Sequence, residues 1–252
     1  PARGGGPVST RIRQRRRERI RSAVVRLRTD AAHDEGISLV ELIVGILVLG
    51  IVSALIAGLF TSTMQVVTVS SALDRNTRMA SNGMNEMSRI VRAGTPYPVA
   101  GAIEPLPAFA LVRNEEFTMY AYVNLANSDQ KPVKVKFSVE NGSLVETTWK
   151  STLQSSGYYT FGSSAPTTRT LASSVVPKAS GSPYIFTYLD ANGAPIAVPN
   201  TLQGLVGDDA LRGVAAVTIT LTIQGSSTDT RSRVTLVNTV GIPNLGQNRV
   251  IS

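Results

Sequence analysis

The longest apolar stretch of the chain runs from Ile37 to Phe60 and reads ISLVELIVGILVLGIVSALIAGLF. Glu41 is the only charged residue in it. At 1.5 Å per residue, a helix of this length covers a hydrocarbon core of about 30 Å. The pattern therefore predicts a membrane-spanning helix over residues 37–60.

The helical pattern continues beyond Phe60, because apolar residues recur at spacings near three and four while charged residues occupy other faces. Gly94 and Pro96 then give a stop signal. We expect one helix from about Ser38 to Ala93, in which residues 61–94 form an amphipathic continuation that packs on a folded domain. The apolar positions on its expected packing face are Val66, Val69, Leu73, Ala80, Met84, Met87 and Val91.

After Pro96 the pattern changes to the alternation of β-strands. Asn141-Gly142 joins two alternating runs and is the strongest short signal for a hairpin. A serine- and threonine-rich stretch, residues 151–182, is expected to be a long surface loop. The fold class is therefore α+β, with the long helix packed on an antiparallel β-sheet in a β-rich domain over residues 95–252. Strands are expected at 117–124, at 133–150 as the hairpin, and at 184–189, 216–224 and 233–240.

The positive charge of the chain is concentrated before the apolar stretch. The 252 residues carry a net charge of +8, and residues 1–36 hold ten basic and four acidic residues, or +6. Arginine-rich flanks stay in the cytoplasm, so the carboxyl-terminal domain is expected on the other side of the membrane. If residues 1–36 are a leader that is removed, the rest is nearly neutral and a nucleic-acid partner loses its main support.

The junction between these two segments reads Glu35-Gly36-Ile37-Ser38-Leu39-Val40-Glu41. No Ala-x-Ala site of an ordinary secretory signal follows the apolar core. The junction resembles the prepilin leader junction of type IV pilins and type II secretion pseudopilins. That resemblance implies that prepilin peptidase cuts after Gly36 and that Ile37 becomes a new, N-methylated amino terminus.

Glu41 needs an explanation, because a carboxylate inside a membrane helix costs roughly 2.5 to 3.5 kcal/mol on insertion scales. The resemblance implies that Glu41 pairs with the terminal amine of a neighbouring subunit and sets the register of a filament. The plainer alternative is a tolerated charge one turn inside the membrane that reaches back to water.

Three departures from the family pattern favour a minor subunit. The mature chain would start with isoleucine rather than phenylalanine, no proline occurs between Ile37 and Gly94, and the leader of 36 residues is long. The run YIFTYLDANG and the strands after it are similar to the minor pseudopilin J. The partners implied are prepilin peptidase, other pilin or pseudopilin subunits, the membrane bilayer and the filament assembly machinery.

The inventory of reactive side chains is poor. His33 is the only histidine, lies in the expected leader, and the chain has no cysteine. Histidine-based triads, thiol catalysis and zinc sites are therefore excluded from the mature chain, and we expect neither an enzyme nor a cofactor. Glu115 and Glu116 are interpreted as solvated loop charges rather than as a catalytic pair.

Two possible binding patterns each have a plainer alternative. Oxygen ligands for calcium are available from Asp190, Asn192, Asp208 and Asp209, but a simple Asp-Asn-Gly turn is favoured because the full calcium-loop spacing is absent. A basic aromatic strip for DNA would use Lys131, Lys134, Lys136, Lys150 and Trp149, but a solvated hairpin face is favoured.

The aromatic residues of the expected loop, Tyr158, Tyr159 and Phe161, are candidate anchors for a neighbour or a ligand, or they cover the core of the loop itself.

The function indicated by the sequence is a non-enzymatic minor pilin or pseudopilin in a type IV pilus-like or type II secretion-like filament. The alternative is an uncleaved signal-anchored protein that binds a surface ligand or DNA, and a hydrolase on a stalk is weakest. The sequence leaves open whether the filament serves secretion, adhesion, motility or DNA uptake.

Overall fold

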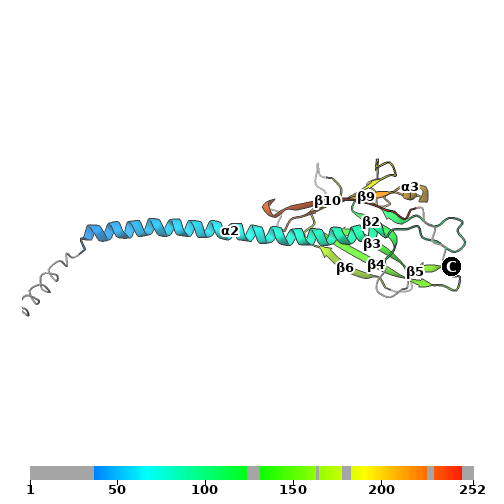
Figure 1. Cartoon of the computed structure of the whole chain (residues 1–252), viewed down its shortest axis with the longest axis horizontal. Coiled ribbons are helices and arrows are strands. Elements are labelled where there is room, and N and C mark those ends of the chain that lie inside the picture. Colours follow the sequence, from blue (N-terminus) through cyan, green and yellow to red (C-terminus); the bar gives the residue numbers. More distant parts are fainter. Residues whose placement is uncertain (1–36, 124–130, 163–164, 178–182, 226–229, 246–252) are drawn as a thin grey trace, which may run out of the picture. The chain divides into compact units, whose positions relative to one another are not determined.

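The computed structural model describes residues 37–123, 131–162, 165–177, 183–225 and 230–245 (Figure 1). The predicted leader, including Gly36, lies outside these residues. The chain divides into two compact units whose boundary falls between Thr63 and Met64, within one helix.

The helix, α2, spans Leu39–Arg92 and confirms the single long helix predicted from the pattern. It is long and apolar enough to cross a membrane, and none of its most apolar stretch is buried in protein. Every residue from Leu39 to Phe60 is exposed. This segment has no protein partner among the described residues, as a lipid-facing helix requires.

The packed part of α2 begins later than the sequence predicts. Val66 is 65% exposed and Leu73 is 39% exposed, so both predictions of burial were wrong. Apolar spacing alone does not show where the neighbouring strands end, and Asn76 is the first fully buried residue of the helix. The buried residues of α2 are Asn76, Ala80, Gly83, Met84, Met87, Ser88, Ile90 and Val91.

The first sheet is antiparallel, with strand order β1-β2-β3-β4-β5, and β6 also pairs with β4. The predicted hairpin is confirmed, because β3 and β4 are joined at Asn141 (φ 49°) and Gly142 (φ 70°). Positive φ at both positions is what a tight hairpin turn demands. The strands are β1 (Phe109–Val112), β2 (Glu116–Tyr122), β3 (Pro132–Glu140), β4 (Ser143–Leu153), β5 (Tyr159–Phe161) and β6 (Thr167–Ala172).

A second antiparallel sheet has the order β10-β9-β7-β8, so the structure has two sheets where the sequence predicted one. Alternation reveals strands but not which of them pair, and this decides the number of sheets. The elements are β7 (Phe186–Leu189), β8 (Pro195–Ile196), α3 (Asp208–Arg212), β9 (Ala216–Ile223), the 3-10 turn η2 (Thr230–Ser232) and β10 (Val234–Gly241).

The prediction of a long loop over residues 151–182 was wrong. β4 continues to Leu153, and both β5 and β6 pair with it. Most of β6 is exposed, so its polar sequence marks an edge strand rather than a loop. Threonine is polar, which suggested a loop, but it is also β-branched and therefore favours strands.

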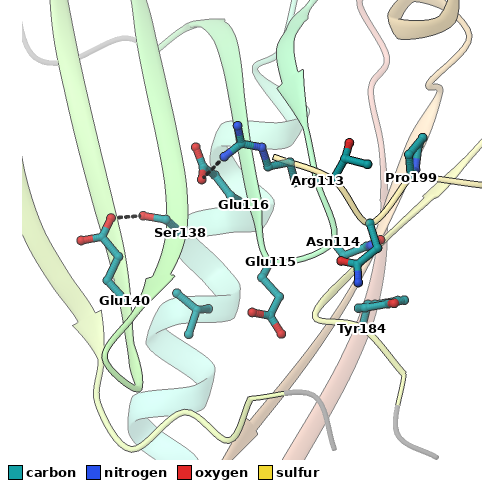
Figure 2. A pocket seen from close by; sticks show the side chains of 11 residues that line it. Arg113, Asn114, Glu115, Glu116, Ser138, Glu140, Tyr184 and Pro199 are labelled. Atoms are coloured by element: carbon teal, nitrogen blue, oxygen red, sulfur yellow. Dashed lines mark hydrogen bonds and ion pairs between the residues drawn. The ribbon is translucent and has the colours of Figure 1, made fainter. Parts of the chain in front are cut away.

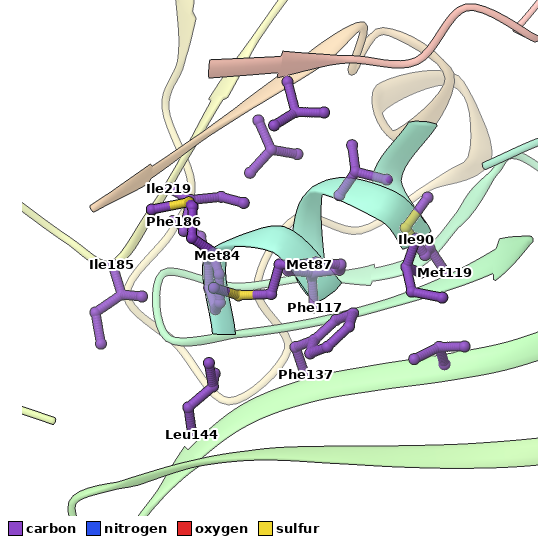
Figure 3. Packing of buried hydrophobic residues seen from close by; sticks show 14 of the residues in the cluster. Met84, Met87, Ile90, Phe117, Met119, Phe137, Leu144, Ile185, Phe186 and Ile219 are labelled. Carbon is purple, nitrogen blue, oxygen red and sulfur yellow. The ribbon is translucent and has the colours of Figure 1, made fainter. Parts of the chain in front are cut away.

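The packed part of α2 lies between the two sheets, and Figure 3 shows Met84 and Met87 directed into the shared core. A Cβ atom added to Gly83 would lie 3.2 Å from Leu144 of the first sheet and 3.4 Å from Leu221 of the second. The two methionines are 6% and 0% exposed, which confirms their predicted role as core residues. The α+β class, with a long helix on antiparallel strands, is thereby confirmed.

Candidate functional site

The amino-terminal end of α2 is fixed by Ser38. Its Oγ accepts a hydrogen bond from the Glu41 backbone N–H at 3.3 Å, and its carbonyl accepts one from Leu42 at 3.1 Å. Ser38 and Glu41 therefore have the spacing of a capping box, Ser-x-x-Glu, which satisfies donors that a helix start leaves free. Sequence reasoning missed Ser38, although this four-residue spacing could have identified it.

Glu41 lies in the first turn of α2, where the partial positive charge of the helix start favours a carboxylate. It is exposed, and within the described part of the chain no side chain forms an ion pair with it. Ile37, two residues before the helix, is 71% exposed. Both residues named by the prediction are therefore accessible, and Gly36 lies outside the described residues.

A group of alternating charges joins the end of α2 to the first sheet. Glu86 pairs with Arg89 at 2.6 Å, and Arg169 of β6 bonds both Glu86 and the buried Glu146, the latter at 2.7 Å. The hydrogen bond from Arg89, with the charges of Arg89 and Arg169, lowers the pKa of Glu86. The hydrogen bond to Glu146 raises the pKa of Arg169. These residues border a cavity of about 400 Å³.

A larger pocket of about 600 Å³ lies where the β1–β2 turn meets the end of β3 and the start of β7 (Figure 2). Arg113 pairs with Glu116 at 3.0 Å on one side of it, and Ser138 donates to Glu140 at 2.7 Å on another. That hydrogen bond, together with Lys136, lowers the pKa of Glu140. The lining is polar and its carboxylates are held by neighbouring donors.

The interpretation as a solvated loop charge was wrong for Glu116, whereas Glu115 does lie in the turn between β1 and β2 and is half-exposed. Both are partly buried and line the pocket, and Glu116 begins β2 in an ion pair with Arg113. Tyr188 donates a hydrogen bond from its hydroxyl to the Arg113 carbonyl at 2.7 Å, which stabilises the backbone of this turn. Tertiary contacts to Tyr188, far along the chain, cause the difference.

The structure divides the lysines considered for a DNA strip between the two faces of the first sheet, since Lys134 and Lys136 share one face and Lys150 lies on the other. Lys134 lies opposite Trp149, whereas Lys150 lies opposite Val133 and therefore on the other face of the sheet. Lys136 is paired with Glu140 at 3.2 Å. A continuous basic strip does not form, because successive residues of a strand point to opposite faces.

The predicted aromatic anchors join a cluster on the first sheet. Phe161 lies 5.3 Å from Tyr97 and 5.6 Å from Tyr120 between ring centroids, and the Tyr97 hydroxyl donates to the Tyr159 carbonyl. Lys134 lies 4.6 Å above the Trp149 ring. Burial raises the pKa of Tyr97 to about 12. These rings pack on one another, which favours the second interpretation of this segment, a local core.

The residues considered for calcium take part in local structure. One Asp190 carboxylate oxygen accepts hydrogen bonds from the N–H groups of Asn192 and Ala194, each at 2.8 Å, as in an Asp-Asn-Gly turn. Asp208 and Asp209 form the first turn of α3. In the described ranges no three His, Cys, Asp or Glu side chains are grouped to hold a metal ion. The Asp-Asn-Gly turn is the interpretation that the sequence favoured, and calcium binding stays the untested alternative.

No protein-family model matches the chain, and no curated protein matches it. Among solved structures, a chain of the GspK–GspI–GspJ complex from the type 2 secretion system of enterotoxigenic Escherichia coli is similar in fold. The alignment covers 67% of this chain and 99% of that chain, with 15% sequence identity and a TM-score of 0.36. At this level of similarity the function has to be argued from the residues.

Proposed function

We propose that the chain is a structural subunit, of the minor pilin or pseudopilin kind, in a type IV pilus-like or type II secretion-like filament. The observation that carries the proposal is the division of α2. Its first part, residues 39–60, is apolar, is not covered by protein and carries the single carboxylate Glu41. Its last part, from Asn76 onward, packs into a β-rich domain.

Maturation would begin with a cut between Gly36 and Ile37 by prepilin peptidase. Ser38 supports this position, because the helix begins directly after it and the cut would leave Ile37 as the residue before this cap. Cleavage would place a positive amine on Ile37, four residues before Glu41.

Assembly would then depend on Glu41. The carboxylate has no ion-pair partner among the described residues of its own chain, so its charge is available to the amine of a neighbouring subunit. Pairing there would remove the roughly 2.5 to 3.5 kcal/mol that an unpaired carboxylate costs in a membrane helix. The outer domain would face away from the cytoplasm.

The processing step is tested by the intact mass of the native protein purified from membranes. Wild-type protein should lack residues 1–36, whereas Gly36→Leu should retain them. Gly58→Leu, a matched change at an exposed helical glycine, should be processed as wild type. Normal processing of Gly36→Leu would count against the proposal, and retention of residues 1–36 in wild type would favour the uncleaved surface-binding alternative.

The assembly step is tested with Glu41→Gln, which keeps the shape of the side chain and removes its charge. We expect normal membrane insertion and at least a tenfold loss of filament incorporation, since about 1.4 kcal/mol corresponds to tenfold. Thr63→Val is the matched control, because Thr63 is exposed and, among the described residues, its hydroxyl donates only to the Leu59 carbonyl. Full incorporation of Glu41→Gln would contradict a role in assembly.

A further inference from the structure

The second sheet ends in a long regular strand with an open edge. β10 pairs with β9 without interruption, from Val234 opposite Ile223 to Gly241 opposite Ala216. Within the described residues no other strand pairs with β10. The eight residues present an edge of about 27 Å.

The hydrogen bonding shows which backbone groups face outward. Ile242 donates its N–H to the Ala215 carbonyl at 3.0 Å, whereas Thr220 of β9, which lies opposite Val237, donates its N–H away from β10, to the Ile185 carbonyl at 2.8 Å. Hydrogen-bonded and non-hydrogen-bonded pairs alternate along an antiparallel ladder. The even-numbered residues of β10 therefore bond to β9, whereas the odd-numbered ones turn their N–H and C=O groups toward the open edge. The outward-facing residues are Thr235, Val237, Thr239 and Gly241, and all four are exposed.

The other sheet edges are protected in the ways that natural proteins use against unwanted pairing. The edge of β1 is bridged by Leu205, whose N–H donates to the Val112 carbonyl at 2.9 Å. β5 has only three residues, β8 has two and contains Pro195, and β6 carries Arg169. β10 has no charged residue, no proline and no bulge.

β10 is also held rigidly as a template. Thr222 and Thr235 are joined by a side-chain hydrogen bond of 2.9 Å, and Thr218 and Thr239 by one of 2.8 Å. On the inner side, Asn238 donates to Ser88 of α2 at 3.1 Å. These bonds fix the register, so an added strand would meet donors and acceptors in defined positions.

We propose that the free edge of β10 binds an extended strand of another filament subunit by β-strand addition. Only a peptide backbone matches a row of alternating donors and acceptors at this spacing. The bound strand should be uncharged and β-branched opposite Val237, which is 63% exposed and offers an apolar contact. The identity of the partner rests on the proposed function.

A second copy of this chain, paired antiparallel through β10, does not fit an anchored protein. α2 and β10 run in the same direction, because Asn76 bonds Ser232, Ser88 bonds Asn238 and Arg92 bonds Asn244. Antiparallel pairing of two β10 strands would therefore reverse the packed part of one α2 relative to the other. Because the subunits of one filament point the same way, this symmetric pair does not fit the proposed filament, and the edge is assigned to a strand of a different subunit.

The test is amide hydrogen exchange, resolved to single residues, on the isolated full chain in detergent and on assembled filaments. In the isolated chain the amides of Thr235, Val237 and Thr239 should exchange fast, whereas those of Leu236 and Asn238 should exchange slowly. Assembly should slow the odd-numbered amides at least tenfold and leave the even-numbered ones unchanged. Odd-numbered amides that stay fast in assembled filaments would overturn the inference.

A substitution makes the same distinction. Val237→Pro removes an outward-facing N–H without breaking a bond to β9, so fluorescence of Trp149, the only tryptophan, should report a folded domain. Incorporation of Val237→Pro into filaments should fall at least tenfold. Thr220→Val, a change on β9 away from the open edge, should have no effect on incorporation. If Val237→Pro assembles normally, the edge is not the contact.

Two further outcomes separate the inference from the proposed function. Because the chain has no cysteine, Val237→Cys supplies one thiol at the edge, and a disulfide-linked homodimer in filaments would overturn the choice of a different subunit. If wild type is processed and Glu41-dependent but Val237→Pro is incorporated normally, only the edge inference fails. A chain that is neither processed nor incorporated overturns both.

Discussion

The two ends of α2 belong to one continuous helix but require different surroundings. From Leu39 to Phe60 every residue is exposed, and apolar side chains surround the whole helix. From Asn76 to Arg92 eight residues are buried on one side, and polar residues occupy the rest. Periodicity, more than hydrophobicity, therefore separates the part that suits lipid from the part that suits protein.

The difference also appears in the glycines. Gly45, Gly50 and Gly58 have open space around the position that a Cβ atom would occupy. At Gly94, just after α2, an added Cβ atom would lie 2.9 Å from the Val91 carbonyl oxygen and 2.3 Å from a Met119 methyl group. The three helical glycines therefore only weaken the helix. Gly94, by contrast, lets Met119 and the Val91 carbonyl lie close to the backbone.

The largest loss of stability should come from removing an aromatic ring from the core that the packed part of α2 forms with the two sheets. Phe117 is fully buried and contacts Phe137 and Phe186 at centroid distances of 5.2 and 4.8 Å. Phe117→Ala should lower the free energy of unfolding of the outer domain by about 3–5 kcal/mol. Thermal denaturation of Phe117→Ala and wild type, followed by Trp149 fluorescence, measures this loss of stability.

Leu47→Ala is the matched control in the bare part, because Leu47 is 59% exposed. It should leave the melting temperature of the outer domain unchanged. Equal losses in the two variants would contradict the division of α2 into a bare and a packed part.

A smaller effect is expected from adding one methyl group. Gly94→Ala should destabilise the outer domain by roughly 1–3 kcal/mol, because the Val91 carbonyl is backbone and cannot move aside as a side chain can. Gly50→Ala should be neutral or favourable, since alanine is the better helix former. Urea unfolding of the two variants compares them, and a stable Gly94→Ala protein would show that this turn is less tightly packed.

The smallest effect concerns pH. The pKa of Glu86 is lowered in the folded protein, chiefly by the hydrogen bond from Arg89. A carboxyl group with a lowered pKa stabilises the fold above its ordinary pKa of 4.5, and this contribution is lost as the pH falls through the lower folded value. The melting temperatures of wild type and Glu86→Gln should therefore differ most at pH 6–7 and converge as the pH falls below about 4. A difference that is constant with pH would exclude this ion pair as its source.

Much of the candidate site was predictable because it depends on neighbours in the sequence. The span, the position of Glu41 and the Asn141-Gly142 hairpin follow from length, periodicity and turn chemistry. The separation of Lys150 from Lys134 was predictable too, since a two-residue turn fixes which residues share a face. The role of Glu116 was not, because the Tyr188 hydroxyl reaches the backbone carbonyls of Arg113 and Glu116 only in the folded domain.

By itself, the sequence determined a bare apolar helix with one carboxylate, its amphipathic continuation, and an α+β domain, because each of these is set by contacts over a few residues. Only the tertiary structure decided that there are two sheets, that burial of α2 begins at Asn76, and that β10 is left with an open edge. These features depend on strand pairing between residues far apart in the chain. Alternation reveals that a strand exists, but it does not reveal its partner.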